Sequence, residues 1–283
     1  MNPRLSSDIA DPNALSKKHW LKCNPAGVSL RRLKSITEAL RGTKVSPGTL
    51  SNLNQKVYGK IDKRRNRKIE DEYPCLYLDG IYLKRSRGGE VRNVAVPVAT
   101  GVNSKGYREI PAVAEGTRED KDSWREFLRY LKGRGVKGVR PVISDKSPGL
   151  IEPLPELYPE AKWQCCIFHF YRNILSKVVR LKSEEVMKPV KAIHAQEERL
   201  EALKKVKTIL SKLKRMKLDT AAKVVEEAAH ETLQYLDFPH KHRTRTRTNN
   251  PLERINKEIR RRTGAVGSFP DGESALMLVA ARL

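Results

Sequence analysis

Three adjoining runs decide the fold: Val139-Arg-Pro-Val-Ile-Ser-Asp145, then Lys146-Ser-Pro-Gly-Leu-Ile-Glu-Pro-Leu154, then Ala161-Lys-Trp-Gln-Cys-Cys-Ile-Phe-His-Phe-Tyr-Arg-Asn173. The first is a short β-rich apolar run, the second opens with a proline and has a helical pattern, and the third is apolar from Trp163 to Phe168. This order predicts a β-α-β unit. Because open α/β sheets hold ligands at the carboxyl ends of their strands, Asp145 is the first candidate for chemistry.

The region before this unit predicts an antiparallel meander. Residues 73–83, 91–102 and 107–114 have strand patterns, with turns at Gly88-Gly89 and at 103–106. Residues 120–131 have apolar positions at helical spacing and stop at Gly133 and Gly135. Three strands, a helix, a strand, a helix and a strand predict an α/β fold with a ribonuclease-H-like mixed sheet, whose first part spans residues 71–173.

The segments on either side of this core have a helical character. We assign no helix or strand to residues 1–26. Residues 27–70 are predicted to be a helix-turn-helix-like DNA-binding segment with a basic linker, because Ser29 and Ser46 can cap two short helices. An ordinary helical hairpin is the alternative. The lysine-rich residues 174–240 predict an all-α insertion of at least two helices, broken at Pro189, with Leu200, Leu203, Val206, Leu210 and Leu213 on one face.

Residues 241–283 predict C-terminal helices that complete the core. Asn250 can cap the first of them, with Pro251 at its first helical position, and Gly264 ends it. Another apolar helix starts at Ser274.

The charge balance predicts a polyanionic partner. The chain of 283 residues has 57 Lys and Arg against 33 Asp and Glu, a formal charge of +24, and nucleic acid is the simplest partner for such a chain. A ribosomal or nucleoid protein can have the same charge, so basicity alone predicts no catalysis. No apolar run is long enough to span a membrane and the polar start is unlike a signal peptide, so we expect a soluble cytoplasmic, nucleoid-associated protein with no membrane partner. Its four cysteines are expected to be reduced thiols.

Three carboxylates are placed for metal-dependent phosphoryl transfer. Such transfer needs charge stabilisation on the attacking and leaving oxygens, which two Mg²⁺ ions about 3.5–4 Å apart supply, and carboxylate oxygens are their preferred ligands. In a fold of this order the first strand, the end of the fourth strand and a later helix converge, and they contain Asp79, Asp145 and Glu253. Each has a structural alternative: Asp79-Gly80 as a hairpin turn, Asp145 as a helix start, and Glu253 in a capping box with Asn250.

Four ordered blocks resemble the signature of one family. They are Tyr77-Leu-Asp-Gly-Ile-Tyr-Leu-Lys84, Ile143-Ser-Asp-Lys-Ser-Pro-Gly-Leu150, Gln164-Cys-Cys-Ile-Phe-His-Phe-Tyr-Arg-Asn173 and Arg247-Thr-Asn-Asn-Pro-Leu-Glu-Arg-Ile-Asn-Lys-Glu-Ile-Arg-Arg-Arg-Thr263. From about Gly27 onward the chain resembles Mutator-type transposases of bacterial insertion sequences, and it looks shortened at both ends. The resemblance implies a ribonuclease-H-like DDE domain with a helical insertion, in which Asp79, Asp145 and Glu253 form the acidic triad.

The same resemblance assigns Cys166 and His169 to the family's Cys-x-x-His element. His169 is a candidate for orienting DNA or a metal-bound water. The alternative is half of a zinc site completed by His240 and His242.

These observations together predict a transposase that binds terminal inverted repeats and target double-stranded DNA, acts as a homo-oligomer on DNA, and cuts and joins strands with Mg²⁺ or Mn²⁺. Basic residues on both sides of the core are expected to grip phosphates without reading sequence: Lys63, Arg64, Arg65, Arg243, Arg245, Arg247, Arg260, Arg261 and Arg262. The alternatives are an inactive DNA-binding remnant or inhibitor of full-length copies, and a nuclease acting on RNA-DNA hybrids.

Overall fold

A computed structural model describes residues 58–87, 90–116, 120–264, 269 and 272–280. These residues belong to two compact units: a larger one, Lys68–Tyr82 with Val94–Lys257, and a smaller one drawn from the remainder. Most of the segment predicted to resemble a helix-turn-helix lies outside the described residues. Residues 58–65 are helical, so Lys63, Arg64 and Arg65 lie in a helix and not in an irregular basic linker.

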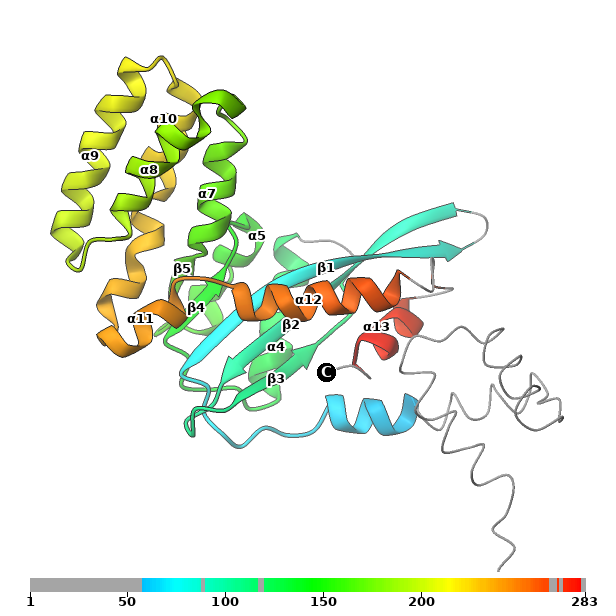
Figure 1. The fold of residues 1–283 in the computed structure, drawn as a ribbon. Helices are drawn as coiled ribbons and strands as arrows, with labels where there is room; N and C mark the ends of the chain where they lie inside the picture. Colours follow the sequence, from blue (N-terminus) through cyan, green and yellow to red (C-terminus); the bar gives the residue numbers. More distant parts are fainter. Residues whose placement is uncertain (1–57, 88–89, 117–119, 265–268, 270–271, 281–283) are drawn as a thin grey trace, which may run out of the picture. The chain divides into compact units, whose positions relative to one another are not determined.

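A five-stranded mixed sheet carries the larger unit (Figure 1), which confirms the predicted mixed α/β class. Its strand order is β3-β2-β1-β4-β5, with β1 parallel to β4, β4 parallel to β5, and β2 antiparallel to β3. The strands have the following bounds: β1 Cys75–Arg87, β2 Glu90–Val102, β3 Arg108–Val113, β4 Pro141–Ser144 and β5 Lys162–Cys165. Asp79 and Gly80 lie inside β1, so the hairpin-turn alternative is wrong.

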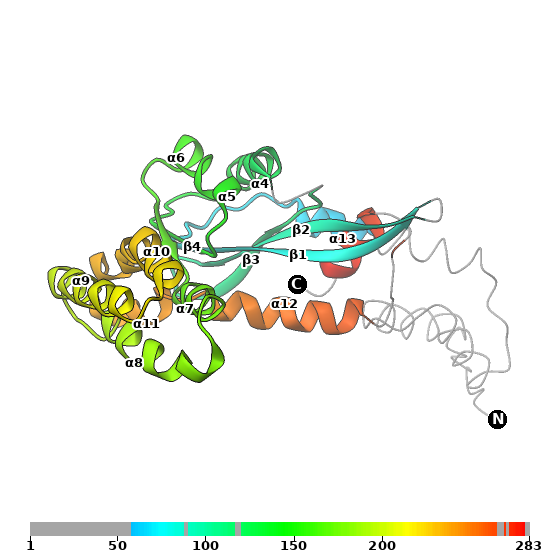
Figure 2. The same cartoon turned by 90° about the horizontal axis from the view of Figure 1, so that it is seen from above.

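Short helices cover one face of this sheet, opposite α12 in the view from above (Figure 2). They are α4 Lys121–Gly133, α5 Pro148–Ile151 and α6 Leu154–Leu157. Asp120 caps α4 by accepting the Ser123 N–H, and Gly135 follows its end at φ 100°, where glycine is favoured. The helical segment predicted to open at Pro148 is present as two short helices, α5 and α6.

Alternate residues of β1 and β4 face opposite sides of the sheet. Leu76, Leu78 and Val142 belong to the hydrophobic core that also contains Trp124 and Leu128 of α4. Side chains in a strand alternate between faces, so Tyr77 and Asp79 on β1, like Ile143 on β4, face the other side. The alternation turns Asp79 away from the core beneath α4.

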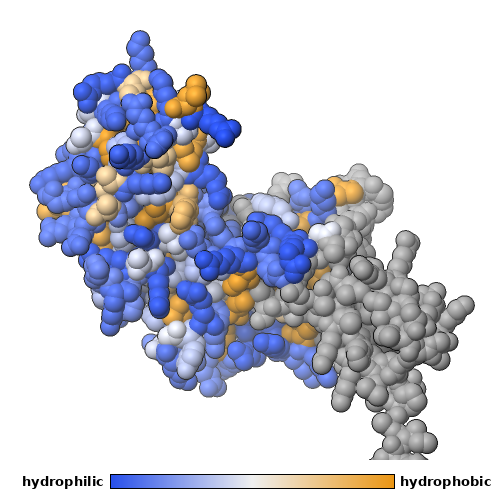
Figure 3. All heavy atoms as spheres, viewed as in Figure 1, coloured by the Kyte–Doolittle hydropathy of each residue, from blue (hydrophilic) through white to orange (hydrophobic). Residues whose placement is uncertain are grey.

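The helical segment, residues 167–247, joins β5 to α12 and has its own core. Its elements are α7 Ile167–Leu175, η1 Arg180–Lys182, α8 Ser183–Ile193, α9 Arg199–Arg215, α10 Asp219–Ala228, η2 His230–Asp237 and α11 His240–Thr246. Pro189 lies inside α8, so the predicted break there is wrong: buried Val186, Val190 and Ile193 hold the helix together despite the lost N–H. Figure 3 shows a largely hydrophilic face over these helices.

The apolar stripe of α9 largely follows the prediction. Val206 and Leu213 are buried, and Leu203 and Leu210 are half-buried against the same core, whereas Leu200 is 70% exposed. Ala202 and Ile209 are also buried, so the stripe includes two residues that the prediction did not name.

The last described helices are α12 Asn250–Thr263 and α13 Gly272–Ala280. The carbonyl of Asn249 accepts the N–H of Glu253 at 3.0 Å, so Asn249, one residue before the predicted cap, precedes the first turn of α12. In the described part of the chain, no helix has the length and apolarity required to cross a bilayer.

Candidate functional site

Asp79 and Asp145 lie at the same level on neighbouring parallel strands. The register pairs Leu76 with Val142 and Tyr77 with Ile143. Two residues further along, the same register reaches Asp79 on β1 and Asp145 just beyond the end of β4. Because adjacent strands are about 4.8 Å apart and side chains two residues apart share a face, both carboxylates are directed to the face opposite α4.

Asp79 is held by two hydrogen bonds. The Asn256 amide donates to its Oδ2 at 2.6 Å, and the Gly80 N–H donates to its Oδ1 at 2.9 Å. Burial and the neighbouring Asp145 carboxylate nevertheless raise the pKa of Asp79 to about 6, against the lowering by these two donors and by His169. Without a cation, the site therefore disfavours the ionised form of Asp79.

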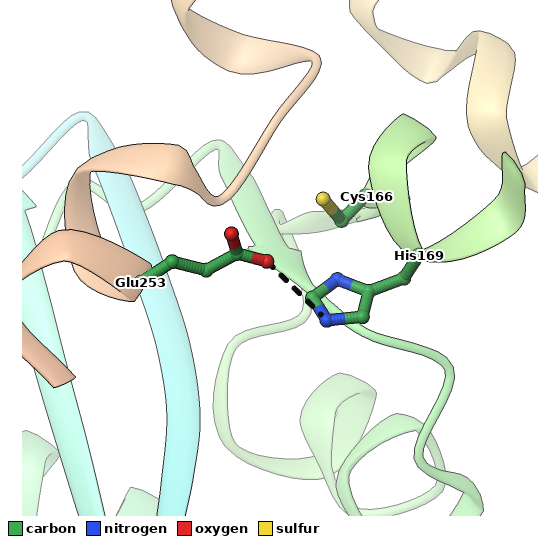
Figure 4. A group of neighbouring side chains, drawn as sticks. All are labelled: Cys166, His169 and Glu253. Carbon is green, nitrogen blue, oxygen red and sulfur yellow. Dashed lines mark ion pairs between the residues drawn. The ribbon is translucent and has the colours of Figure 1, made fainter. Parts of the chain in front are cut away.

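Glu253 enters the site from the first turn of α12 and meets His169 of α7 (Figure 4). The His169 Nε2 lies 3.4 Å from the Glu253 Oε1. Cys166, immediately before α7, completes a group whose potential ligand atoms all lie within 4.8 Å of one another. Glu253, and not His240 or His242, is thus the described residue that joins Cys166 and His169.

The α11–α12 junction, residues 245–249, holds these elements together. The Tyr77 hydroxyl donates to the Arg245 carbonyl at 3.0 Å, and the Ile167 N–H donates to the Arg247 carbonyl at 3.1 Å. Asn249 makes two further bonds: its side-chain amide donates to the Leu78 carbonyl at 3.2 Å, and its N–H donates to the Cys166 Sγ at 3.3 Å. The junction therefore fixes the start of α12 against both β1 and the start of α7.

The Cys166 thiol is buried at this contact. Desolvation raises its pKa, opposed by backbone N–H groups of Asn249, His169 and Phe168, while Glu253 adds to the rise. Without a cation, burial therefore favours the protonated thiol.

The basic residues proposed for phosphate contact have different surroundings. Arg243 donates to the carbonyls of Phe238, Glu197 and Leu236, which uses three of its five N–H groups inside the fold. Arg245 is exposed and Arg247 is half-buried.

The remaining basic candidates with described side chains belong to the smaller unit. Arg260, Lys63 and Arg64 are exposed. Arg261 is exposed and donates twice to Glu258 at 2.8 Å, and Arg65 pairs with Asp62 at 2.7 Å.

The donor set fits hard divalent cations. Asp79 and Asp145 offer carboxylate oxygens, the ligand type that Mg²⁺ prefers. The Glu253 Oε1 and the Asn256 Oδ1 are buried and accept no hydrogen bond within the described residues. A bound cation would compensate these buried acceptor oxygens and the repulsion between the Asp79 and Asp145 carboxylates.

Sequence reasoning missed Asn256 and Asn249. Asn256 is 1% exposed and lies on the same stripe of α12 as Leu252 and Ile259, so a polar residue at a core position was the available signal. Asn249 carried no separate signal, because Asn249-Asn250 read simply as a helix cap.

The chain is similar to known proteins of one family. The family described as "Transposase, Mutator family" matches residues 13–283, so the resemblance extends further toward the N-terminus than Gly27. The chain is 36% identical over 255 residues to a protein of Rhizobium meliloti named as the transposase for insertion sequence element ISRM5, covering 90% of this chain and 64% of that protein.

Two further relatives are similar. The Burkholderia multivorans transposase for IS406 is 35% identical, covering 91% of this chain and 66% of its own length. The Mycobacterium tuberculosis transposase for IS1081 is 33% identical, covering 92% and 63%. The chain therefore spans 63% to 66% of the length of these relatives. With a family match over nearly its whole length, the chain belongs to the Mutator family of transposases.

Proposed function

We propose that this chain cuts and joins DNA strands at the ends of a mobile element, with a ribonuclease-H-like domain and Asp79, Asp145 and Glu253 as its acidic triad. The proposal is supported by the register of β1 and β4, which brings Asp79 of β1 level with Asp145 just beyond the end of β4. Family membership supports it, because the relatives are named as insertion-sequence transposases.

Divalent cations, Mg²⁺ or Mn²⁺, would supply charge stabilisation on the attacking and leaving oxygens of the phosphodiester. The protein's contribution is to hold the ligands. Asn256 and Gly80 fix both carboxylate oxygens of Asp79, and the junction places Glu253 beside the sheet. His169, close to Glu253, can donate a hydrogen bond to a phosphate oxygen or a water at the same place.

Double-stranded DNA is the proposed substrate. The formal charge of +24 favours binding of the phosphate backbone. Among the basic candidates of the larger unit, Arg245 of α11 is exposed, whereas Arg243 and Arg247 are half-buried. Arg243 has two N–H groups left for a phosphate after bonding three carbonyls. Assembly of two or more copies on DNA belongs to the same proposal.

Strand cleavage tests this function. The purified chain is incubated with a labelled duplex carrying the DNA that flanks its gene, with Mg²⁺ or Mn²⁺, and compared with Asp145→Asn. Asp122→Asn is the matched control, because its side chain is 89% exposed on α4. We expect cleavage by the wild type and by the control and none by Asp145→Asn.

Other outcomes contradict parts of the proposal. Full cleavage by Asp145→Asn would show that the metal ligands are wrong. Salt-sensitive binding without cleavage by the wild type would favour the inactive DNA-binding alternative. Preference for an RNA-DNA hybrid over duplex DNA would favour the nuclease alternative.

A further inference from the structure

The group of Cys166, His169 and Glu253 has a chemistry unlike that of the two aspartates. It offers one sulfur, one imidazole nitrogen and one carboxylate oxygen, all within 4.8 Å of one another. Thiolate and imidazole ligands select Zn²⁺ and similar borderline or soft ions, whereas Mg²⁺ takes oxygen ligands. The two ligand sets therefore suit different cations.

The spacing of the group suits a tetrahedral ion. Bonds of about 2.0–2.3 Å from such an ion to one sulfur and two nitrogen or oxygen atoms separate these ligand atoms by about 3.3–3.6 Å. The His169 Nε2 and the Glu253 Oε1 are already 3.4 Å apart. The widest pair of the group has to approach by at most about 1.5 Å to reach this geometry.

One ring nitrogen and one carboxylate oxygen of the group form no hydrogen bond in the described part of the chain. They are the buried His169 Nδ1 and the buried Glu253 Oε1, and the latter lies 3.4 Å from the His169 Nε2 in an ion pair. Figure 4 shows the Glu253 carboxylate, the His169 ring and the Cys166 sulfur around one common space. Buried polar atoms normally form hydrogen bonds, so a buried carboxylate oxygen that accepts none, beside an imidazole and a thiol, favours a bound cation.

The surroundings of Cys166 suit a metal-bound thiolate. The Asn249 N–H donates to its Sγ at 3.3 Å, and the residue stands at the N-terminal end of α7, where backbone N–H groups are directed outward. Hydrogen bonds of this kind orient a ligand and stabilise its charge. The same Asn249 is anchored to Leu78 of β1, so the sulfur position is fixed by the fold.

We propose that Cys166, His169 and Glu253 form a binding site for one thiophilic divalent cation of the Zn²⁺ class. Binding releases the thiol proton to solvent and leaves the fourth ligand position to water. The inference rests on the proposed function only in its consequence: Glu253 belongs both to this group and to the proposed acidic triad. Occupation by Zn²⁺ therefore competes for one of the proposed catalytic ligands and should inhibit strand cleavage.

Cobalt substitution tests the site without DNA. The purified full chain, freed of metal, is titrated with Co²⁺ and followed by the thiolate-to-cobalt charge-transfer band. We expect one Co²⁺ per chain, displaced by stoichiometric Zn²⁺ but not by excess Mg²⁺. Absence of the band, or its displacement by Mg²⁺, would overturn the proposal.

Variants identify the ligands. Cys166→Ser should lose the band, whereas Cys165→Ser, which removes the adjacent buried thiol, should keep it. Glu253→Gln retains the sulfur ligand, so it should keep the band and bind at least about 10-fold more weakly. If a thermal melt shows that Cys166→Ser is unfolded, the Co²⁺ affinity of Glu253→Gln is the measurement that tests the ligand assignment. A band that survives in Cys166→Ser, or unchanged affinity in Glu253→Gln, refutes the assignment.

The two proposals fail in different ways. Asp145→Asn should lose cleavage but keep the cobalt band, because Asp145 is no part of the three-ligand group. A chain that cleaves DNA but binds no Co²⁺ refutes the thiophilic site alone. A chain that binds Co²⁺ without cleaving DNA refutes the proposed function alone.

Discussion

Replacing Asp79 by asparagine should stabilise the metal-free chain. Burial and Asp145 raise the pKa of Asp79 from 3.8 to about 6. The folded chain therefore keeps a proton that the unfolded chain releases between these two values, so stability falls as the pH rises through this window. At about 1.4 kcal/mol per pKa unit, ionised Asp79 costs about 3 kcal/mol above pH 7.

The asparagine removes this cost and keeps the packing. Its Oδ1 can accept the Gly80 N–H as the carboxylate does. If the Asn256 side chain turns by half a rotation about its last bond, its unpartnered Oδ1 can accept from the new amide. We therefore expect Asp79→Asn to gain about 3 kcal/mol at pH 8 and about half of that at pH 5.

Urea denaturation in EDTA at both pH values measures the gain, with the exposed Asp122→Asn as control. Added Mg²⁺ should stabilise the wild type and not Asp79→Asn, because ligands stabilise the state that binds them. A variant no more stable than the wild type at pH 8, or a gain independent of pH, would refute the electrostatic account of Asp79.

Two further perturbations test other parts of the larger unit. Asn256→Ala deletes the donor to the Asp79 carboxylate. Allowing for the better helix propensity of alanine, this variant should lower the free energy of unfolding by about 1–2 kcal/mol, whereas the exposed control Lys257→Ala should not change it. Stability and cleavage equal to those of the wild type would show that Asn256 does not position Asp79. Buried His194 has its pKa lowered from 6.5 to about 3 by desolvation and Arg247. The unfolded chain thus takes up a proton that the folded chain refuses, and between pH 7 and pH 5 the wild type should lose about 2 kcal/mol more than His194→Gln in urea denaturation; parallel losses would contradict this.

The hydrogen bonds of His194 define its neutral form. The Thr232 hydroxyl donates to the Ala229 carbonyl at 2.6 Å, so at 2.8 Å from the His194 Nε2 it can only accept. The proton is therefore on Nε2, and the Nδ1 accepts from the Tyr171 hydroxyl at 2.8 Å. Protonation of Nδ1 would break this network, which is the structural reason for the expected loss of stability in acid.

The sheet could be predicted from sequence because its signals were local. Alternating apolar residues and turn signals gave β1, β2 and β3, and Asp145 followed β4 as expected. The run from Trp163 to Phe168 was read as one strand, but β5 ends at Cys165 and α7 begins at Ile167. A short, continuous apolar run carries no period that separates a strand from a buried helix.

Other features depended on contacts distant in sequence. The N–H of Asn249 meets the sulfur of Cys166 across 83 residues, and no spacing rule connects these positions. The helix through Pro189 was likewise decided by burial of its neighbours, which outweighed the local penalty of proline. Local pattern thus located the strands beside Asp79 and Asp145 and the helix that contains Glu253, whereas tertiary packing determined the contacts of these side chains.

A single backbone hydrogen bond joins the two ends of the helical segment. The Ile167 N–H donates to the Arg247 carbonyl at 3.1 Å, so the first and last residues of this segment are adjacent. Between these two ends it is packed around a core of its own. Because η2 also bonds Gln164 of β5, a change of length is expected to be tolerated in the helices before η2, where it need not displace the acid-bearing helix α12.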